Sequence, residues 1–328
     1  MRAPDFWTRN DFASRLAVAA LTPFGWAYGA SVAWKAAHTH SYRAKAKIIC
    51  VGNLTAGGTG KTPVAIAIAR ALIERKLRVI FLSRGFGGRR HSAAFVDPKN
   101  DCAADVGDEP LLLAGSAPVI VSRDRAAGAR LADAEGADVI IMDDGHQNFS
   151  VMKDLSLVVV DAKAGFGNGR ILPAGPLRES VNQGLSRTNA VVLVGDGAPR
   201  LDGFAKPVLR ARLVPADGAE LRGARVVAFA GIGRPEKFFE TLQALGAEIM
   251  ETRSYADHHA YTAAEIARLK RKAANAKAML VTTEKDHVRL TAAERAGVAF
   301  LPVRAAFEDD AGLARLLDSI SPRAIPAL

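Results

Sequence analysis

The chain has 328 residues, of which 49% are hydrophobic and 24% charged, a composition typical of a folded protein with room for two domains. Its formal charge of +10 indicates an anionic partner: a phosphorylated small molecule, an acidic membrane surface or nucleic acid. Aromatic residues make up only 6%, and no segment interleaves Arg with Phe or Tyr, so we expect no nucleic acid partner.

The two cysteines, Cys50 and Cys102, show neither a C-x-x-C pattern nor the spacing of metal ligands. This usage indicates a reducing compartment without structural disulfides. We expect both side chains to lie in the core.

The first predicted element is an uncharged apolar segment, residues 16–34, flanked by basic residues. It is just long enough to span a bilayer. Residues 23–25 (Pro-Phe-Gly) interrupt it, which favours two short helices lying against a membrane and anchored by Trp26 and Trp34. A true span and an ordinary pair of core helices remain open, whereas the nucleotide motif that follows disfavours a secretory signal.

Residues 47–52 form an apolar strand that leads into the loop "VGNLTAGGTGKTP", and residues 63–76 carry apolar side chains at helical spacing. Strand, glycine-rich loop and helix in this order predict a phosphate-binding loop, or P-loop. Its backbone N–H groups and the positive end of the helix would face phosphate oxygens. We expect Lys61 to reach the β- and γ-phosphates of a nucleotide and Thr62 to offer its hydroxyl to Mg²⁺. The predicted nucleotide-binding residues are Thr55, Ala56, Gly57, Gly58, Thr59, Gly60, Lys61 and Thr62.

Further elements alternate along the chain, which predicts a P-loop NTPase-type α/β fold: a parallel sheet with helices on both faces. Strands are expected at residues 79–82, 118–121, 139–142, 155–160, 190–194, 226–230 and 278–282, and helices at 126–134, 235–245, 262–274 and 313–320. The periodicity weakens between residues 197 and 223. We therefore predict a membrane-associating segment (1–40), a P-loop core (41–205) and a smaller C-terminal α/β domain (206–328) that contributes to the active-site cleft.

The strand at 139–142 ends in Asp143 and Asp144, which places two carboxylates beside the predicted P-loop. Carboxylate oxygens are ligands that Mg²⁺ prefers, so we predict a magnesium site from Thr62, Asp143 and Asp144. On the residues alone, the pair could equally be an ordinary junction of strand and turn.

Two clusters could supply a catalytic base: Asp108 with Glu109 in "VGDEP", and His258 with its neighbours in "YADHHAY". Zinc ligation by the second cluster is disfavoured, because it lacks a Cys or His partner at ligand spacing. Ordinary surface positions remain an open interpretation of both. Basic residues in glycine- and proline-rich loops are candidates for binding a phosphorylated substrate, namely Arg84, Arg125, Arg170 and Arg178.

Eight motifs in order resemble the tetraacyldisaccharide 4′-kinase family over most of the chain: "VGNLTAGGTGKTP", "LSRGFGG", "VGDEPLLLA", "DDGHQN", "GNGRILPAGPLRE", "AFAGIGRPEKFF", "DHHAYT" and "VTTEKD". The resemblance implies a kinase of lipopolysaccharide assembly at the cytoplasmic face of the bacterial inner membrane. It would use ATP and Mg²⁺ to phosphorylate the 4′-hydroxyl of a tetraacylated glucosamine disaccharide 1-phosphate.

The same resemblance implies roles for individual residues. Asp108 and His258 would form a dyad that activates the acceptor hydroxyl, and Gln147, Arg178 and Glu179 would line the site. The commoner family form of "DDGHQN" is Asp-Asp-Gly-Phe-Gln-His, so His146 and Asn148 depart from it. Thr55, which stands where the general P-loop pattern has its first glycine, is usual in this family.

The alternative function is a P-loop switch ATPase or GTPase that acts through a protein partner. Switch ATPases carry a second Lys before the glycine pair, where this chain has Ala56, and "TEKD" does not match a guanine-reading Asn-Lys-x-Asp motif. We therefore expect the partners to be an acylated disaccharide phosphate lipid and an anionic membrane surface, with no obligate protein partner.

Overall fold

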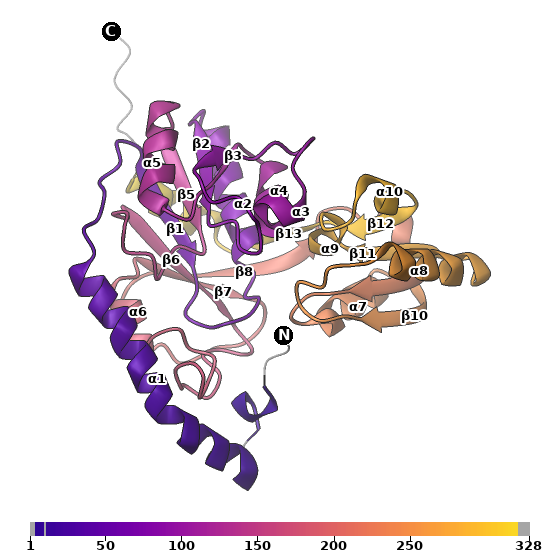
Figure 1. The fold of residues 1–328 in the computed structure, drawn as a ribbon, viewed down its shortest axis with the longest axis horizontal. Helices are drawn as coiled ribbons and strands as arrows, with labels where there is room; N and C mark the ends of the chain where they lie inside the picture. The colour runs from indigo at the N-terminus through magenta and orange to yellow at the C-terminus, as the bar shows by residue number, and fades with distance from the viewer. Residues whose placement is uncertain (1–3, 10, 321–328) are drawn as a thin grey trace.

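The computed structural model describes residues 4–9 and 11–320, which contain two β-sheets. The larger sheet has nine strands in the order β13-β8-β7-β6-β1-β5-β2-β4-β3, and the smaller one four in the order β10-β9-β11-β12. Figure 1 shows the smaller sheet and its helices to one side of the larger sheet. The predicted α/β fold with a mostly parallel sheet and a second α/β unit is confirmed.

The strands of the larger sheet are β1 (Lys47–Gly52), β2 (Val79–Ser83), β3 (Ala94–Phe95), β4 (Val119–Val121), β5 (Val139–Asp143), β6 (Leu155–Asp161), β7 (Ala190–Val194), β8 (Val208–Pro215) and β13 (Val303–Phe307). Those of the smaller sheet are β9 (Arg225–Ala230), β10 (Glu248–Ser254), β11 (Met279–Thr283) and β12 (Val298–Leu301).

The helices are η1 (Asp5–Trp7), α1 (Phe12–His38), α2 (Lys61–Glu74), α3 (Ala103–Val106), α4 (Asp108–Ala114), α5 (Arg125–Ala134), α6 (Val181–Ser186), η2 (Ala219–Leu221), α7 (Pro235–Ala244), α8 (Ala263–Asn275), α9 (Glu284–His287), α10 (Ala292–Arg295) and α11 (Asp310–Asp318). We call β9–β12 with α7–α10 the smaller unit, and the nine-stranded sheet with its helices the larger unit.

The centre of the larger sheet is β1, which lies between β5 and β6 and runs parallel to both. Its residues from Ile48 to Val51 are at most 1% exposed. One face packs against α2 through Ile68, and the opposite face packs against the small side chains of α5. Since both faces are covered, the strand has the continuous apolar run that predicted it.

Two strands at one edge connect the two units. β8 pairs in parallel with β7, and β13 pairs antiparallel with β8, with Val303 opposite Pro215. The chain therefore leaves the larger sheet after β8, builds the smaller unit and returns through β13. The last helix, α11, packs Leu313 and Leu317 into the core that holds β1 and α2.

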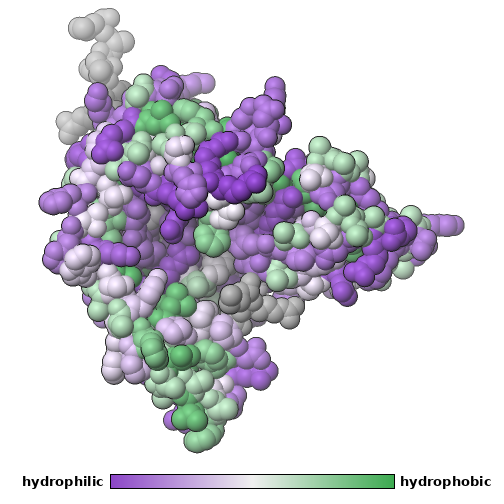
Figure 2. All heavy atoms as spheres, in the orientation of Figure 1, coloured by the Kyte–Doolittle hydropathy of each residue, from purple (hydrophilic) through white to green (hydrophobic). Residues whose placement is uncertain are grey.

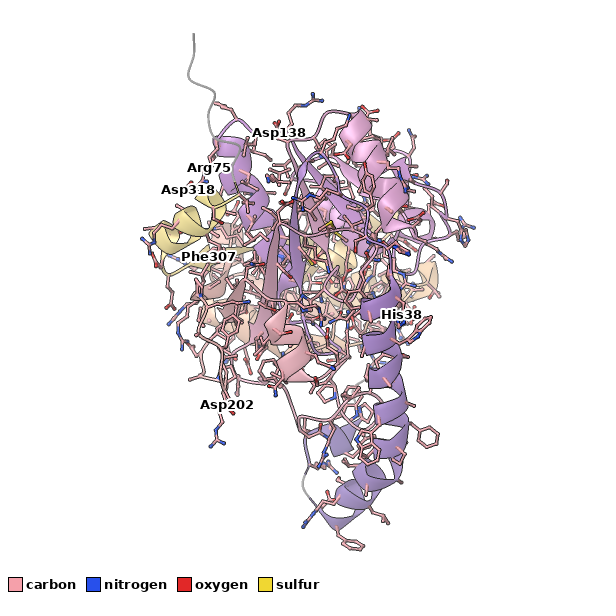
Figure 3. The ribbon with its side chains drawn as sticks, turned by 90° about the vertical axis from the view of Figure 1, so that its left-hand side faces the viewer. His38, Arg75, Asp138, Asp202, Phe307 and Asp318 are labelled. Atoms are coloured by element: carbon pink, nitrogen blue, oxygen red, sulfur yellow. The ribbon has the colours of Figure 1, made fainter. Side chains whose placement is uncertain are left out.

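An ion pair between Arg75 and Asp318 links the last helix, α11, to α2. Arg75 Nη1 lies 2.8 Å from Asp318 Oδ1, which joins the end of α2 to α11 (Figure 3).

The predicted division at residue 206 placed β8, β13 and α11 in the second domain, but these elements lie with the larger sheet. The division into domains itself stays a prediction.

The prediction of two short helices in the N-terminal segment is wrong. This segment forms one continuous helix of 27 residues, α1, with Pro23 inside it. Proline removes one backbone N–H, and the turns on either side, which contain several Ala residues, continue the helix. By length and composition α1 is able to cross a membrane. Large hydrophobic side chains are exposed along it, namely Phe12, Leu16, Phe24, Trp26 and Trp34. Figure 2 shows apolar surface in the region that α1 occupies in Figure 1.

Two glycines let α1 approach the larger unit. A Cβ atom on Gly25 would lie 2.9 Å from the Ile171 carbonyl oxygen, and one on Gly29 would lie 2.9 Å from the Ile171 side chain. Gly25 and Gly29 are buried, in contrast to the apolar side chains on the outer surface. Close packing at the glycines thus holds α1 against the loop around Ile171 while its apolar side chains stay exposed.

The cysteines differ from each other. Cys50 is buried in β1 as expected, but Cys102 is exposed and caps α3, so its predicted core position is wrong. Its Sγ lies 2.8 Å from Asp105 Oδ2 and its backbone N–H donates to the same carboxylate. A helix-capping position explains this exposure.

Substitution of Ile68 by Ala is expected to lower the free energy of unfolding by about 2–5 kcal/mol, because it leaves a cavity between α2 and the sheet. Ile73 on the same helix is 39% exposed and provides the matched control, so Ile73→Ala should cost less than about 1 kcal/mol. Urea unfolding followed by circular dichroism measures both. Equal losses would show that α2 is not packed as described.

Candidate active site

The glycine-rich loop connects β1 to the first residue of α2, as predicted. Gly57 and Gly60 have φ values of 111° and 89°, in a region where glycine is favoured. A Cβ atom on Gly57 or Gly58 would meet nothing within 4 Å, so the loop backbone is open on that side. Lys61 and Thr62 are 8% and 9% exposed at the start of the helix. Open backbone beside a helix N-terminus is the arrangement that binds a phosphate chain.

Thr55 departs from the general P-loop pattern for a structural reason. It forms an antiparallel bridge with Leu177, and the neighbouring N–H of Ala56 donates to the Pro176 carbonyl at 2.7 Å. The Asn53 side chain donates to the Thr55 carbonyl at 2.7 Å. The backbone at this position is therefore held by pairing with another segment, and it does not need the freedom of glycine.

Asp143 and Asp144 lie at the end of β5 and face the start of α2. The Thr62 hydroxyl donates to Asp143 Oδ2 at 3.2 Å, and Lys61 Nζ lies 3.9 Å from Asp144 Oδ1. Arg178 Nη1 donates to the same Asp144 oxygen at 2.8 Å. Asp143 Oδ1 is buried and has no hydrogen-bond partner among the described residues.

The two carboxyls differ in their acidity. Burial, and then the charge of Glu109, raises the pKa of Asp143 to about 7. Burial acts in the same direction on Asp144, but Lys61 and Arg178 outweigh it and hold the pKa of Asp144 below its usual range. A free, buried carboxylate oxygen next to a hydroxyl and a second carboxylate fits the oxygen ligands of Mg²⁺. In the described part of the chain, no group of three or more His, Cys, Asp or Glu side chains is arranged to hold a metal ion.

Asp108 and His258 belong to different units and lie side by side. Asp108 is the first residue of α4, His258 follows β10, and His258 Nδ1 is 3.0 Å from Asp108 Oδ2. Burial raises the pKa of Asp108, but the hydrogen bond with His258 and the charges of Lys285 and Arg289 outweigh burial and hold this pKa below its usual range. The structure therefore brings the predicted dyad together with an ionised Asp108.

A cavity of about 560 Å³ extends from the ends of the strands to α1. Asp143 and Asp144 line it, as do Tyr28 and Lys35 of α1. Four of the predicted substrate-binding residues lie in its wall: Arg84, Arg125, Gln147 and Arg178. The cavity thus places basic side chains between the paired aspartates and the N-terminal helix.

Arg125 is the most deeply buried of these basic residues, with 3% of its surface exposed. Its Nη1 donates to the Ser122 carbonyl at 2.7 Å, and its Nε has no partner among the residues that the structure describes. Burial, and then the nearby Arg84, lowers the pKa of Arg125 to about 10. A buried cation with an unused donor is suited to an anionic ligand.

Two predicted substrate residues lie elsewhere. Arg170 lines a separate cavity of about 270 Å³ beside α1. Glu179 is 1% exposed and is held by Arg187 Nη2 at 2.5 Å and by the Gln147 amide at 3.0 Å. Glu179 does not line the larger cavity; it supports Gln147, which does.

Sequence reasoning missed the contacts that the smaller unit makes with the P-loop side of the sheet. Asp161, at the end of β6, accepts hydrogen bonds from Arg234 at 2.6 Å and from Lys237 at 2.9 Å. Arg234 also lies 3.5 Å from the Gly58 carbonyl oxygen. The motif "AFAGIGRPEKFF" contained both cations, but nothing in its spacing indicated their partner. Lys35 and Arg123 also line the larger cavity, but they were not among the site residues predicted from the sequence.

A parallel sheet whose central strand leads through a glycine-rich loop into a helix, opposite paired aspartates on the adjacent strand, defines a P-loop nucleotide-binding protein. The chain matches the tetraacyldisaccharide-1-P 4′-kinase family over residues 17–321. It belongs to this family.

Individual relatives agree with this assignment. A tetraacyldisaccharide 4′-kinase of Rhodospirillum rubrum is 48% identical over the whole of both chains. One from Methylobacterium sp. is 52% identical, with 99% of this chain and all of the relative covered. The crystal structure of LpxK from Aquifex aeolicus in complex with ATP is similar with a TM-score of 0.75 and 26% identity, covering 93% of this chain and 99% of that one.

His146 stands where the commoner family form has Phe, and it is 1% exposed. Its Nδ1 lies 3.1 Å from Ser156 Oγ, and its Nε2 lies 3.1 Å from the Gly184 carbonyl oxygen. Burial, and then the charge of Lys153, lowers the pKa of His146 to about 3. The ring is therefore a neutral, hydrogen-bonded part of the core behind the P-loop.

This burial predicts a pH dependence of stability. The unfolded imidazole binds a proton below pH 6.5 and the folded one only near pH 3, so the stability due to neutral His146 is full above pH 6.5 and is lost as the pH falls toward 3. Between pH 7 and pH 5, wild type should lose about 1–2 kcal/mol more than His146→Phe in urea unfolding. His40→Phe, at an exposed position, should follow wild type. If the free energy of unfolding of wild type and of His146→Phe changed in parallel with pH, the assignment of His146 as a neutral, buried imidazole would be contradicted.

Proposed function

We propose that this protein transfers the γ-phosphoryl group of ATP to the 4′-hydroxyl of a tetraacylated glucosamine disaccharide 1-phosphate, a step of lipid A biosynthesis. The observation that carries the proposal is the Asp108–His258 pair, which comes from two units of a chain with a P-loop. A nucleotide switch needs a phosphate-binding loop, but it does not need a carboxylate–imidazole pair for a second substrate. The relatives named above are kinases, and nothing favours the switch alternative.

The P-loop residues would bind the nucleotide. Backbone N–H groups from Gly57 to Thr62 would face the phosphates, and Lys61 would balance the charge that develops on the transferred group. Asp143, with its free Oδ1, and Thr62 would hold Mg²⁺, and Asp144 would orient Lys61 and Arg178. When bound, Mg²⁺ neutralises phosphate charge.

The dyad would remove the proton from the acceptor. A sugar hydroxyl is a weak nucleophile near neutral pH, so a positioned base contributes roughly 10²–10⁴-fold. With its Nδ1–H donated to the ionised Asp108, His258 carries a lone pair on Nε2. This nitrogen would accept the proton of the 4′-hydroxyl while the hydroxyl oxygen bonds to the γ-phosphorus of ATP, and the bond from that phosphorus to the bridging oxygen would break to release ADP.

The basic wall of the larger cavity would hold the phosphorylated sugar. Arg84, Arg125 and Arg178 line it, and the buried Nε of Arg125 is free to donate. Arg170 would act at the smaller cavity beside α1, and Glu179 would act through Gln147. The excess of positive charge agrees with a substrate that carries a phosphate in addition to ATP.

The N-terminal helix would attach the enzyme to the cytoplasmic face of the inner membrane. Its exposed aromatic side chains, with basic residues at both ends of the apolar segment, suit an anionic bilayer surface. Because Tyr28 and Lys35 of α1 line the larger cavity, the surface that contacts lipid is continuous with the site.

The test incubates the protein with γ-labelled ATP, Mg²⁺ and the disaccharide 1-phosphate lipid. Wild type should transfer label to the lipid, and Asp108→Asn should lower kcat by roughly 10²–10⁴-fold with little change in ATP affinity. Asp105→Asn is the control, because Asp105 lies on the neighbouring α3 and pairs with Arg89. Absence of label in the lipid with wild type would reject the proposed kinase activity. Equal losses of kcat and ATP affinity in the variant would show that Asp108 does not act in the catalytic dyad.

Replacing Phe24 and Trp26 together by Ser is expected to weaken binding to vesicles containing anionic phospholipid by roughly tenfold or more, because two exposed aromatic anchors are lost. Phe24 and Trp26 are 65% and 68% exposed. Met250→Ser, at an exposed apolar position of β10, is the control and should bind as wild type does. Co-sedimentation measures all three. Unchanged binding of the double variant would exclude α1 as the anchor.

A further inference from the structure

The motif "VTTEKD" has no role in the function proposed above, and the residue that follows it by three positions contacts the dyad. Arg289 is 6% exposed and lies just beyond α9. Its Nε and Nη2 donate to Asp108 Oδ2 at 2.8 Å and 2.6 Å. Its Nη1 donates to Asp286 Oδ1 and to the Gly231 carbonyl, both at 2.7 Å. One guanidinium thus joins two carboxylates from the two units.

Asp286 makes the position of this guanidinium rigid. It is completely buried and accepts hydrogen bonds from the Thr283 hydroxyl at 2.6 Å, the Gly231 N–H at 3.0 Å and the Tyr261 hydroxyl at 2.9 Å. Both carboxylate oxygens of Asp286 therefore accept hydrogen bonds from residues of the smaller unit. Arg289 projects from this anchor toward α4 with little freedom to move.

The other charged groups around Asp108 bind it less closely. Lys285 Nζ lies 3.9 Å from Asp108 Oδ2 and 3.4 Å from Glu109 Oε1. The second Asp108 oxygen, Oδ1, accepts the N–H of Glu109 at 3.0 Å. His258 completes the surroundings at 3.0 Å. Among the described residues, Lys285 and Arg289 are the Lys and Arg side chains within 4 Å of Asp108, and Arg289 alone of these two makes hydrogen bonds to it.

We propose that Arg289 is a positioning residue for phosphoryl transfer, which holds the Asp108 carboxylate ionised and turned toward His258 when the smaller unit is docked on α4. The proposal rests on the proposed function. Because His258 and Arg289 both belong to the smaller unit, one docking event brings the imidazole and its carboxylate partner into contact. The motif that precedes Arg289 supplies the buried anchor for this contact.

The kinetic test compares Arg289→Gln, which removes the charge, with Arg289→Lys, which keeps the charge but cannot reach both carboxylates. We expect Arg289→Gln to lower kcat by roughly 10–100-fold, as for other groups that orient a reacting residue, with KM for ATP within about twofold of wild type. Loss of a cation beside the Asp108–His258 pair favours the protonated state of the pair, so the acid limb of the kcat–pH profile should also move upward. Arg289→Lys should show an intermediate kcat and an unmoved acid limb.

Arg295→Gln is the matched control. Arg295 belongs to the same unit, and within the described part of the chain its side chain donates to the carbonyls of His287 and Val288, so it tests the general effect of losing a partly buried arginine contact. If Arg289→Gln has the kcat and acid limb of Arg295→Gln, the proposal is overturned. A parallel loss of kcat and ATP affinity without movement of the acid limb would also overturn it, since that result describes a purely structural role.

A second measurement does not depend on the reaction. Hydrogen–deuterium exchange of the backbone amides in residues 108–114 should be roughly tenfold faster in Arg289→Gln than in wild type or Arg295→Gln, because the start of α4 loses its contact with the smaller unit. Unchanged exchange would overturn the proposal even if the variant is inactive. If wild type fails to phosphorylate the lipid, the proposed function fails, and the exchange result still decides whether Arg289 holds Asp108.

Discussion

The parallel pairing of β1, β2, β5 and β6 is the constraint from which the site follows. Parallel strands all end at the same edge of a sheet, so the segments that follow them converge there. β1 leads into the P-loop, β5 ends at Asp143, and β6 ends at Asp161. The hydrophobic core on both faces of these strands thereby determines the positions of polar groups that take no part in the core.

The route of the chain through β8 and β13 adds the second half of the site. The smaller unit is an insertion between two strands of the larger sheet, so it stays tethered at both of its ends. Asp108–Arg289 and Asp161–Arg234 are charged contacts between the two units, at different points of the same edge. Separation of the units would break hydrogen bonds to two buried carboxylates, and water or ligands would have to replace their partners.

The fold and the nucleotide site were predictable because they depend on local patterns. Each of three patterns spans only a few neighbouring residues and could be recognised from the sequence: the apolar run at Ile48–Val51, the three glycines of the loop and the aspartates at the end of β5. The pairing of Asp108 with His258 came only from the resemblance, since 150 positions separate them. Arg289 and strand β8 were missed for a related reason. The partner of a charged side chain becomes evident only in the folded chain, and Arg210 and Arg212 interrupt the apolar run of β8, which lies between β7 and β13.

The bridge between Thr55 and Leu177 also connects the P-loop to the segment on which the N-terminal helix packs. Leu177 also pairs with Ile171, and Ile171 is the residue against which the glycines of α1 pack. A continuous path of backbone contacts therefore runs from the apolar N-terminal helix to the first position of the P-loop. The apolar helix and the nucleotide loop are thus supported by the same segment, residues 171–177, so α1 cannot separate from the sheet without loss of contacts that this segment makes.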